Sequence, residues 1–388
     1  MNTLQQGLIT LIKSGLTGEG FALPADFRLE EAVPLLKRHH MVNLVYAGAV
    51  NCGISAKDPT MQMLFPLCCK ALMKSENQLQ AMDMLLKAFQ ENGIDHMLVK
   101  GQLLKALYPK PELRYMGDAD ILIRMEQYEK IQPIMESLGY THQYASDHEL
   151  VWHSKALHVE LHKRLIPSYN KDYYTYYGDG WERAKRVAGT SYAMSQEDAW
   201  IFLFTHFAKH YRDGGIGCRY VADLWLYRNA HPAMDEAYIQ QELECLQLSV
   251  FYNNVLRLLQ VWFEDAPADA KMEYMTDFIF VSGSWGAGDS KVLSAAVKDT
   301  RRFSGRGGRL RYICRVLFPS VNVLREKYAV LRRCPWMLPL VWVYRPFYKV
   351  LFERKTLKKQ QNNLDMLTKE NVELQKKMLR YVGLDFHF

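Results

Sequence analysis

Apolar residues recur every three or four positions over the first 72 residues, as in Leu4, Leu8 and Leu11. This spacing is typical of one face of an α-helix. The same spacing predicts an amphipathic helix over 75–92, which ends on an Asn-Gly pair that supplies a stop signal. The start of the chain is therefore expected to be helical.

Short apolar runs bounded by turn residues follow, a pattern typical of β-strands. Strands are predicted at 96–100, 119–124, 150–153 and 156–162, with a helix over 127–138. Helices on either side of a group of strands predict the α+β class.

Long helices are predicted after residue 194. The sequence from Ser195 to Asp198 has the form of a capping box, and helical spacing continues over 220–227 and 237–263. We predict four regions: an N-terminal helical region (1–74), a core that holds the strands (75–190), a helical domain (191–300) and a C-terminal extension (301–388).

The last predicted helix, Thr356–Tyr381, repeats apolar residues at heptad spacing, with Asn371 as one polar layer. This pattern predicts a short coiled coil, and hence a dimer through the C-terminal helix. An amphipathic helix that packs on its own domain fits the pattern equally well.

The composition, with 49% hydrophobic and 23% charged residues, excludes a disordered or fibrous chain. Seven cysteines, an odd number without Cys-x-x-Cys spacing, argue against a disulfide scaffold and a zinc ribbon. The start does not have the pattern of a signal peptide. The longest apolar stretch, Cys334–Tyr344, is shorter than the ~20 residues that a membrane span needs. We therefore expect a cytoplasmic protein.

The net charge of +7 is unevenly distributed. Residues 301–359 hold 16 lysines and arginines against two acids, so the rest of the chain is net acidic. Such a basic segment predicts an anionic partner, either a nucleic acid or a lipid surface, with a peripheral membrane contact in the second case. A solvated basic face is the alternative. If the segment instead lies close to the acidic site described next, it would help to bind an anionic substrate.

The most informative residues are carboxylates. Asp118 and Asp120 are two apart on a predicted strand, so their side chains face the same side. Glu160 lies on another predicted strand and offers a third acid. Oxygen ligands of this kind suit Mg²⁺ or Mn²⁺, so these three residues predict a divalent-metal site. Gly101, at the end of the first strand, would let the backbone approach a phosphate.

In this arrangement the chain resembles the nucleotidyltransferase superfamily of DNA polymerase beta, and more closely its uncharacterised bacterial nucleotidyltransferases. The resemblance covers about residues 75–230. It rests on Val99-Lys100-Gly101, Arg114, Asp118-Ala119-Asp120, Glu160-Leu161-His162, and two helical motifs, His206–His210 and Arg219–Asp223. At the turn, Lys100-Gly101-Gln102 replaces the Gly-Ser or Gly-Gly that is usual in the superfamily.

The resemblance implies a small mixed sheet of the polymerase-beta type, flanked by helices and followed by a mainly helical part. It also implies two-metal transfer of a nucleoside monophosphate from an NTP to an acceptor hydroxyl or amine. Asp118, Asp120 and Glu160 would be the catalytic and metal-binding residues. The nucleotide would be bound by Lys100, Gly101, Gln102, Arg114, His206, Lys209 and His210.

Three alternatives stay open at this point. His206 and His210 share a helical face, where structural histidines are common, and Arg219 and Asp223 are spaced to form an ion pair with each other. As a whole, the chain fits an interaction protein that keeps the fold and binds a membrane surface or nucleic acid through its basic segment and C-terminal helix.

Overall fold

The computed structural model describes residues 1–168, 170–283, 314, 317–319, 321–324, 328, 330–352 and 368–385. These residues fall into two compact units. The first holds the described residues of Met1–Lys209 and Ile216–Trp285, and the second holds those of His210–Gly215 and Gly286–Phe386. None of the described helices is both long enough and apolar enough to cross a membrane.

The chain begins with three short helices, as the periodicity predicts: α1 (Thr3–Thr17), α2 (Leu29–His39) and α3 (Val42–Asn51). A capping box starts α1, because the Asn2 side chain accepts a hydrogen bond from the Gln5 backbone amide and the Gln5 side chain accepts one from the Asn2 backbone amide. The helices α1 and α3 pack against each other at small residues, and the Ser14 hydroxyl donates to the Gly48 carbonyl.

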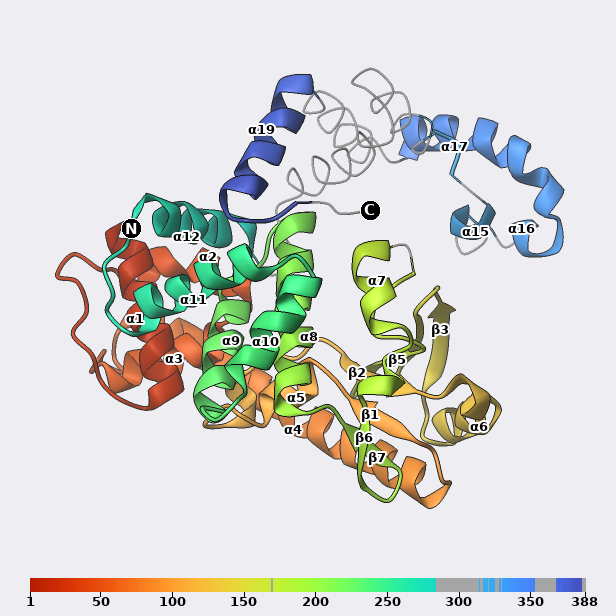
Figure 1. The fold of residues 1–388 in the computed structure, drawn as a ribbon, viewed down its shortest axis with the longest axis horizontal. Coiled ribbons are helices and arrows are strands. Elements are labelled where there is room, and N and C mark those ends of the chain that lie inside the picture. The colour runs from red at the N-terminus through yellow and green to blue at the C-terminus, as the bar shows by residue number, and fades with distance from the viewer. Residues whose placement is uncertain are drawn as a thin grey trace. The chain divides into compact units, whose positions relative to one another are not determined.

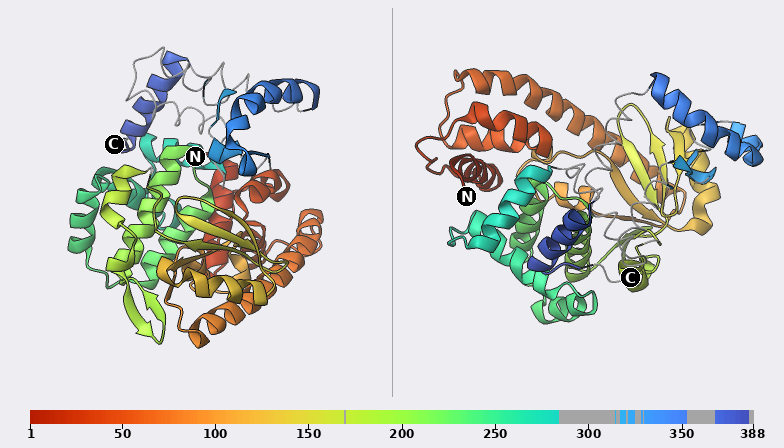
Figure 2. Two further views of the ribbon diagram at one scale, coloured as in Figure 1. Left: turned by 90° about the vertical axis from the view of Figure 1, so that its right-hand side faces the viewer. Right: turned by 90° about the horizontal axis from the view of Figure 1, so that it is seen from above.

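The long helix α4 (Pro59–Glu91) extends from these helices to the sheet (Figure 2). The helix predicted over 75–92 therefore starts earlier, and the domain boundary expected after residue 74 falls inside it. Its start is fixed by Asp58, whose carboxylate accepts hydrogen bonds from two backbone amides of the first turn, with Pro59 in the first helical position. As predicted, the helix ends at an Asn-Gly pair, where Gly93 has a φ of +67°.

Seven strands form one mixed sheet in the order β3-β4-β5-β2-β1-β7-β6 (Figure 1). The strands are β1 (His96–Leu98), β2 (Ala119–Ile123), β3 (Thr141–Ala145), β4 (Glu149–His153), β5 (His158–His162), β6 (Lys185–Ala188) and β7 (Ser191–Ala193). The pairs β1·β7 and β2·β5 are parallel, and the others are antiparallel. The sheet confirms the predicted α+β class.

One face of this sheet carries the main core of the strand region. Alternate residues of three neighbouring strands pack against apolar side chains of α4 and α6 (Tyr128–Ser137). On β2 these residues are Ala119, Ile121 and Ile123, and on β5 they are Val159 and Leu161. Because side chains alternate along a strand, the residues between them face the opposite side of the sheet. That side receives the polar residues of both strands.

Short helical segments connect the strands: α5 (Gly101–Lys105), η1 (Pro111–Leu113), η2 (Met125–Gln127), α7 (Lys171–Tyr177) and η3 (Trp181–Arg183). The later helices are α8 (Gln196–Asp213), α9 (Cys218–Ala230), α10 (Glu236–Cys245), α11 (Ser249–Phe263) and α12 (Ala270–Ser282). Ser195 caps α8, as predicted, by accepting a hydrogen bond from the Asp198 amide. The helix predicted over 237–263 is two helices, since Gln247 between them has a φ of +56°.

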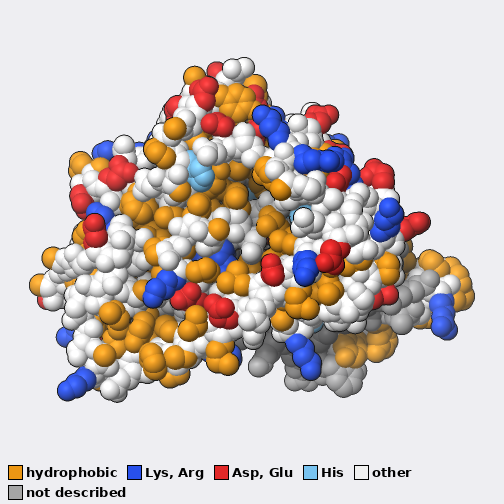
Figure 3. Space-filling model, turned by 90° about the horizontal axis from the view of Figure 1, so that it is seen from below, with side chains coloured by type: hydrophobic (Ala, Val, Ile, Leu, Met, Phe, Trp, Pro, Cys, Tyr) orange, Lys and Arg blue, Asp and Glu red, His pale blue; other side chains and the backbone are white. Residues whose placement is uncertain are grey.

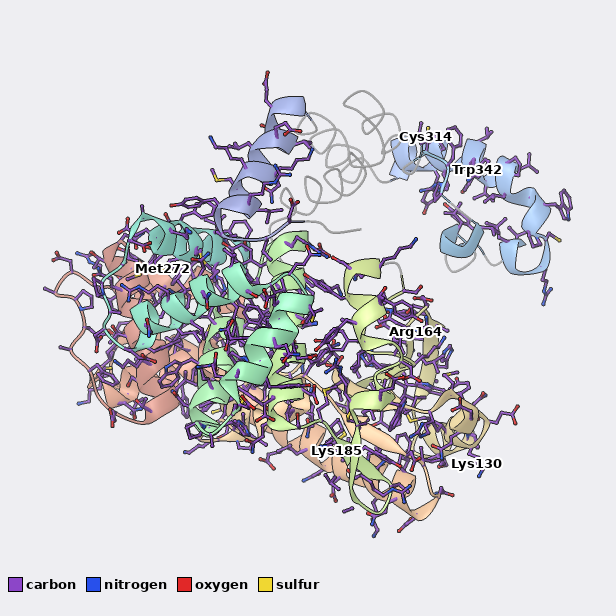
Figure 4. The ribbon with its side chains drawn as sticks, in the orientation of Figure 1. Lys130, Arg164, Lys185, Met272, Cys314 and Trp342 are labelled. Carbon is purple, nitrogen blue, oxygen red and sulfur yellow. The ribbon has the colours of Figure 1, made fainter. Side chains whose placement is uncertain are left out.

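The described part of the second unit contains α15 (Val321–Leu324), α16 (Val330–Arg333), η4 (Pro335–Met337), α17 (Leu338–Phe352) and α19 (Lys369–Tyr381). Trp342 of α17 donates a hydrogen bond to the Pro319 carbonyl, and its ring lies 5.4 Å from that of Phe318 (Figure 4). Most of the basic segment 301–359 before α17, and the first half of the heptad region, lie outside the described residues.

Candidate functional site

Two acids predicted from the sequence lie side by side on the polar face of the sheet. Strands β2 and β5 pair in parallel with Asp120 opposite Glu160, so both side chains point away from α4 and α6. Two residues further along β5, His162 points to the same side. Its Nε2 donates a hydrogen bond to Asp120 Oδ1 at 2.8 Å and lies 3.6 Å from Glu160 Oε2.

Asp118 does not lie on the strand but directly before it, since β2 begins at Ala119. Its charge still acts on the site: burial, followed by the neighbouring Asp120, raises the pKa of Asp118. The cations that oppose this rise are Lys100 and Arg219. The predicted trio of acids is therefore a cluster in which Asp120 and Glu160 are in register and Asp118 approaches from the preceding loop.

A single ammonium balances the centre of this cluster. Lys100 Nζ lies 2.8 Å from Asp120 Oδ1, and its side chain is 17% exposed. Burial opposes ionisation of Asp120, but Lys100 and the hydrogen bond from His162 outweigh it and hold the pKa of Asp120 well below its usual range. Burial also opposes the charge on Lys100, but Asp120, Glu160 and Asp118 together raise its pKa.

Glu160 is affected in the opposite direction. Burial, with the charges of Asp120 and Asp118, raises the pKa of Glu160 to about 8. Burial, followed by the charge of Lys100, lowers the pKa of His162, which favours the neutral imidazole. The other ring nitrogen, His162 Nδ1, is buried without a hydrogen-bond partner among the described residues. The raised pKa values of Glu160 and Asp118 thus reflect burial and a repulsion among the carboxylates that Lys100 alone does not relieve.

The donor set fits a divalent cation. Among the residues that the structure describes, ligand atoms of Asp120, Glu160 and His162 lie within 4.8 Å of one another, and so do those of His148, Glu149 and His162. The two carboxylates suit Mg²⁺ or Mn²⁺, and the imidazole of His162 adds a nitrogen donor to the set. Burial and mutual repulsion of these carboxylates are the physical reason why a cation would bind here, since a cation would stabilise their ionised forms.

The turn that precedes the acids has a constrained backbone. Lys100 has a φ of +50°, which is rare for a residue with a side chain, and Gly101 begins α5. A Cβ at Gly101 would lie 3.3 Å from Arg114 Nη1, so the glycine allows a close approach. Gln102 is half-buried, and its Oε1 has no hydrogen-bond partner in the described part of the chain. Contact of these three residues with a nucleotide remains a prediction.

Arg114 has a structural partner that the sequence spacing did not indicate. Its guanidinium binds both carboxylate oxygens of Asp223 at 2.8 and 2.9 Å, and Nη1 also donates to the Gly101 carbonyl. The expected ion pair between Arg219 and Asp223 is therefore wrong. Instead, Arg219 donates to the Tyr115 carbonyl and adds positive charge near Asp118. Burial of Arg114 explains why Asp223 pairs with Arg114 and not with Arg219, because an enclosed guanidinium needs a carboxylate.

The three remaining predicted nucleotide ligands lie on α8. His206 and Lys209 are half-buried in the first unit, and the His206 ring lies 6.3 Å from the ring of Tyr220. His210 is also half-buried, but it belongs to the second unit. Their part in nucleotide binding remains a prediction.

Two residues of the site, His162 and Arg219, are not predicted from the sequence pattern. The two-residue spacing of His162 from Glu160 does place both side chains on one face of a strand, so a sequence signal for His162 exists. The four-residue spacing of Arg219 from Asp223 instead predicts a local ion pair on a helix, which is the wrong partner for Arg219.

A comparison with known protein families matches residues 25–264 to the family described as uncharacterised nucleotidyltransferase. No curated protein and no solved structure gives a significant match. The matched residues are more than half of the chain and contain the acids, the Lys-Gly turn and Arg114. The chain therefore belongs to the uncharacterised nucleotidyltransferase family.

Proposed function

We propose that this protein is a divalent-metal-dependent nucleotidyltransferase that moves a nucleoside monophosphate from an NTP to an acceptor hydroxyl or amine. The observation that carries the proposal is the register of β2 and β5, which sets Asp120 beside Glu160 with Asp118 next to them. An unrelated structural role would not explain why three acids share a largely buried site around one lysine.

Each residue has a distinct task in this proposal. Asp118, Asp120 and Glu160, assisted by His162, would hold Mg²⁺ or Mn²⁺. When bound, the cation would neutralise phosphate charge and favour attack at the α-phosphate. Glu160 is also suited to accept a proton from the acceptor, because a general base works best when its pKa lies near the working pH. Lys100 would occupy the cation's place beside Asp120 until metal and nucleotide bind.

Variants of the acids test the proposal. With Asp120→Asn or Glu160→Gln, calorimetry should show at least tenfold weaker Mn²⁺-dependent binding of NTPs. Labelled NTPs should also no longer transfer label to any acceptor in a cell extract. Glu126→Gln is the matched control, because this exposed carboxylate follows the same strand outside the cluster. Equal nucleotide affinity in Asp120→Asn and wild type would rule the proposal out.

The basic segment supports a second candidate function, an interaction with an anionic partner. We propose that residues 301–359 bind nucleic acid or a lipid surface, based on their excess of cations. The test is the full-length chain with Arg301, Arg302, Arg306 and Arg309 changed to Glu. Lost binding to RNA or anionic liposomes with intact NTP binding would support a separate function. Unchanged binding to both would contradict it.

A dimer through the C-terminal helix is the associated proposal. On α19, the heptad residues Leu374 and Tyr381 are 52% and 45% exposed, as an unpaired seam would be. Light scattering of wild type and Leu374→Asp tests it. A dimer that the variant converts to a monomer supports the seam, and a monomeric wild type excludes it.

A further inference from the structure

A pocket of about 360 Å³ lies in the first unit, outside the acid cluster. It is formed by the end of α2, the start of α3, the middle of α4, Lys105 of α5 and the segment 112–116. None of its lining residues belongs to the acid cluster. A volume of this size is within the range of small-molecule sites in proteins.

The pocket is lined by a buried lysine that has no partner. Lys105 is only 2% exposed, and its Nζ forms no hydrogen bond with any described residue. Ser75, another lining residue, is 4% exposed, and its Oγ also lacks a partner there. A buried ammonium without a hydrogen-bonding partner costs several kcal/mol, so it normally indicates a missing partner.

Lys105 is nevertheless charged at neutral pH. Burial, followed by the positive charge of Arg114, lowers the pKa of Lys105 to about 8, which leaves it mostly protonated at pH 7. Glu112 and Glu76 act on it from a distance but do not form an ion pair with it. The unmet requirement is therefore for a negative charge inside the pocket.

The charged residues at the rim of the pocket also favour an anionic ligand. Lys37, Lys70 and Lys74 are exposed lining residues, whereas Glu112 is the single acid among the lining residues. Arg114 also lines the pocket, but its charge is already matched by Asp223. The pocket consequently has a positive potential that attracts anions.

The rest of the lining is apolar. Val42, Leu67 and Leu113 contribute aliphatic surface. The Tyr115 ring adds an aromatic wall, held by stacking with His40 at 4.5 Å and by Lys74 at 4.7 Å from its centroid. Hydrophobic surface beside an unpaired cation suits a molecule with two chemically different ends.

We propose that this pocket binds an organic anion with an apolar body, whose carboxylate or phosphate pairs with Lys105 while its hydrocarbon part lies against Val42, Leu67 and Leu113. The Ser75 hydroxyl donates a hydrogen bond to the same anionic group. This site uses none of the acids of the cluster, so its ligand would bind apart from the proposed metal site.

Calorimetry on the full-length protein tests the proposal, with decanoate and decyl phosphate as probes below their micelle concentrations. Decanol and inorganic phosphate serve as partial ligands that lack the charge or the apolar body. Lys105→Met should weaken binding of both probes at least tenfold, and Ala71→Trp, which fills the pocket, should abolish it. Lys110→Met is the matched control, since this exposed lysine lies outside the pocket.

Each outcome of these measurements either supports or overturns the proposed anion site. Tight binding of either anion to wild type and to Lys110→Met, together with its loss in Lys105→Met, supports the site, and the tighter probe identifies the headgroup. Equal affinity of Lys105→Met and wild type, equal binding of decanol and decanoate, or no binding of either anion to wild type would overturn it. Lys105→Met removes an unpaired buried charge, so we expect it to melt at or above the wild-type temperature.

Discussion

The guanidinium of Arg114 binds both carboxylate oxygens of Asp223, at 2.8 and 2.9 Å, across 109 residues of sequence. Both side chains are almost fully buried. Tyr108 donates a further hydrogen bond to Asp223, and Arg114 also reaches the Gly101 carbonyl. This pair therefore ties the turn before the acid cluster to helix α9.

Breaking this pair should strongly destabilise the fold. Arg114→Met or Asp223→Asn leaves one buried group uncompensated, so we expect each to lower the free energy of unfolding by about 3–5 kcal/mol. The double variant Arg114→Met with Asp223→Leu should lose less free energy of unfolding than the two single variants lose together. Urea denaturation measures all three. Arg164→Met, which removes a longer and more exposed contact with Asp147 (Arg164 is labelled in Figure 4), should cost less than ~1 kcal/mol.

Removing the lysine of the acid cluster should strengthen metal binding. In Lys100→Met no ammonium competes with a cation for Asp120, so we expect about tenfold tighter Mn²⁺ binding, or ~1.4 kcal/mol. Titration calorimetry with Mn²⁺ in the absence of nucleotide measures it. Lys110→Met, an exposed lysine, should leave the affinity unchanged. Weaker metal binding in Lys100→Met would show that the two cations do not share a position.

His39 should make the fold sensitive to acid. Its Nδ1 accepts a hydrogen bond from the Cys218 amide and its Nε2 donates to the Phe280 carbonyl, so the neutral ring joins α2, α9 and α12. Burial, more than the nearby charges of Arg38 and His40, lowers its pKa to about 4.

The unfolded chain, with an ordinary histidine pKa near 6.5, therefore binds a proton before the folded protein does. The contribution of neutral His39 to the free energy of unfolding is therefore fully present above pH 6.5. This contribution falls towards pH 4, by up to about 3 kcal/mol. Urea denaturation from pH 4 to 7 should show this fall. His39→Gln should flatten the profile, whereas His153→Gln, at an exposed position, should leave it unchanged.

A methyl group at Gly48 should disrupt the contact of α1 with α3. Helix propensity alone favours Gly→Ala, but a Cβ at Gly48 would lie 1.9 Å from the Leu11 carbonyl oxygen. Because this neighbour is backbone, the helices must separate, and we expect Gly48→Ala to lower the free energy of unfolding by about 3 kcal/mol or more. Thermal denaturation measures it. Gly117→Ala, where the nearest atom is 3.7 Å away, should change stability little.

The exposed hydrophobic residues of α4 show that a local sequence pattern does not predict which apolar side chains are buried. Met63, Phe65 and Met73 on α4 are about half exposed or more, and Figure 3 shows hydrophobic patches between scattered charges on one face of the molecule. Their apolar character alone would place them in the core. Partial burial of a long helix depends on what packs around it, which the helical period does not state.

The sequence by itself determined the periodicities and the phase of the side chains. The alternation of β2 and β5 places Asp120 on one face of its strand and Glu160 on one face of the other, and the stop signals set the end of α4. The strands β3, β6 and β7 escaped prediction, since they carry no buried alternating face. Local patterns are readable because they follow from the geometry of single elements.

Only the tertiary structure decided which residues meet. The parallel register of β2 and β5 brings Asp120 to Glu160 and adds His162, and burial of Arg114 draws Asp223 away from its helical neighbour Arg219. Both outcomes depend on residues far apart in the chain, where the need of buried charges for partners outweighs the small gain of a local pair, about 0.2–0.5 kcal/mol. A spacing within one helix or strand does not contain that information.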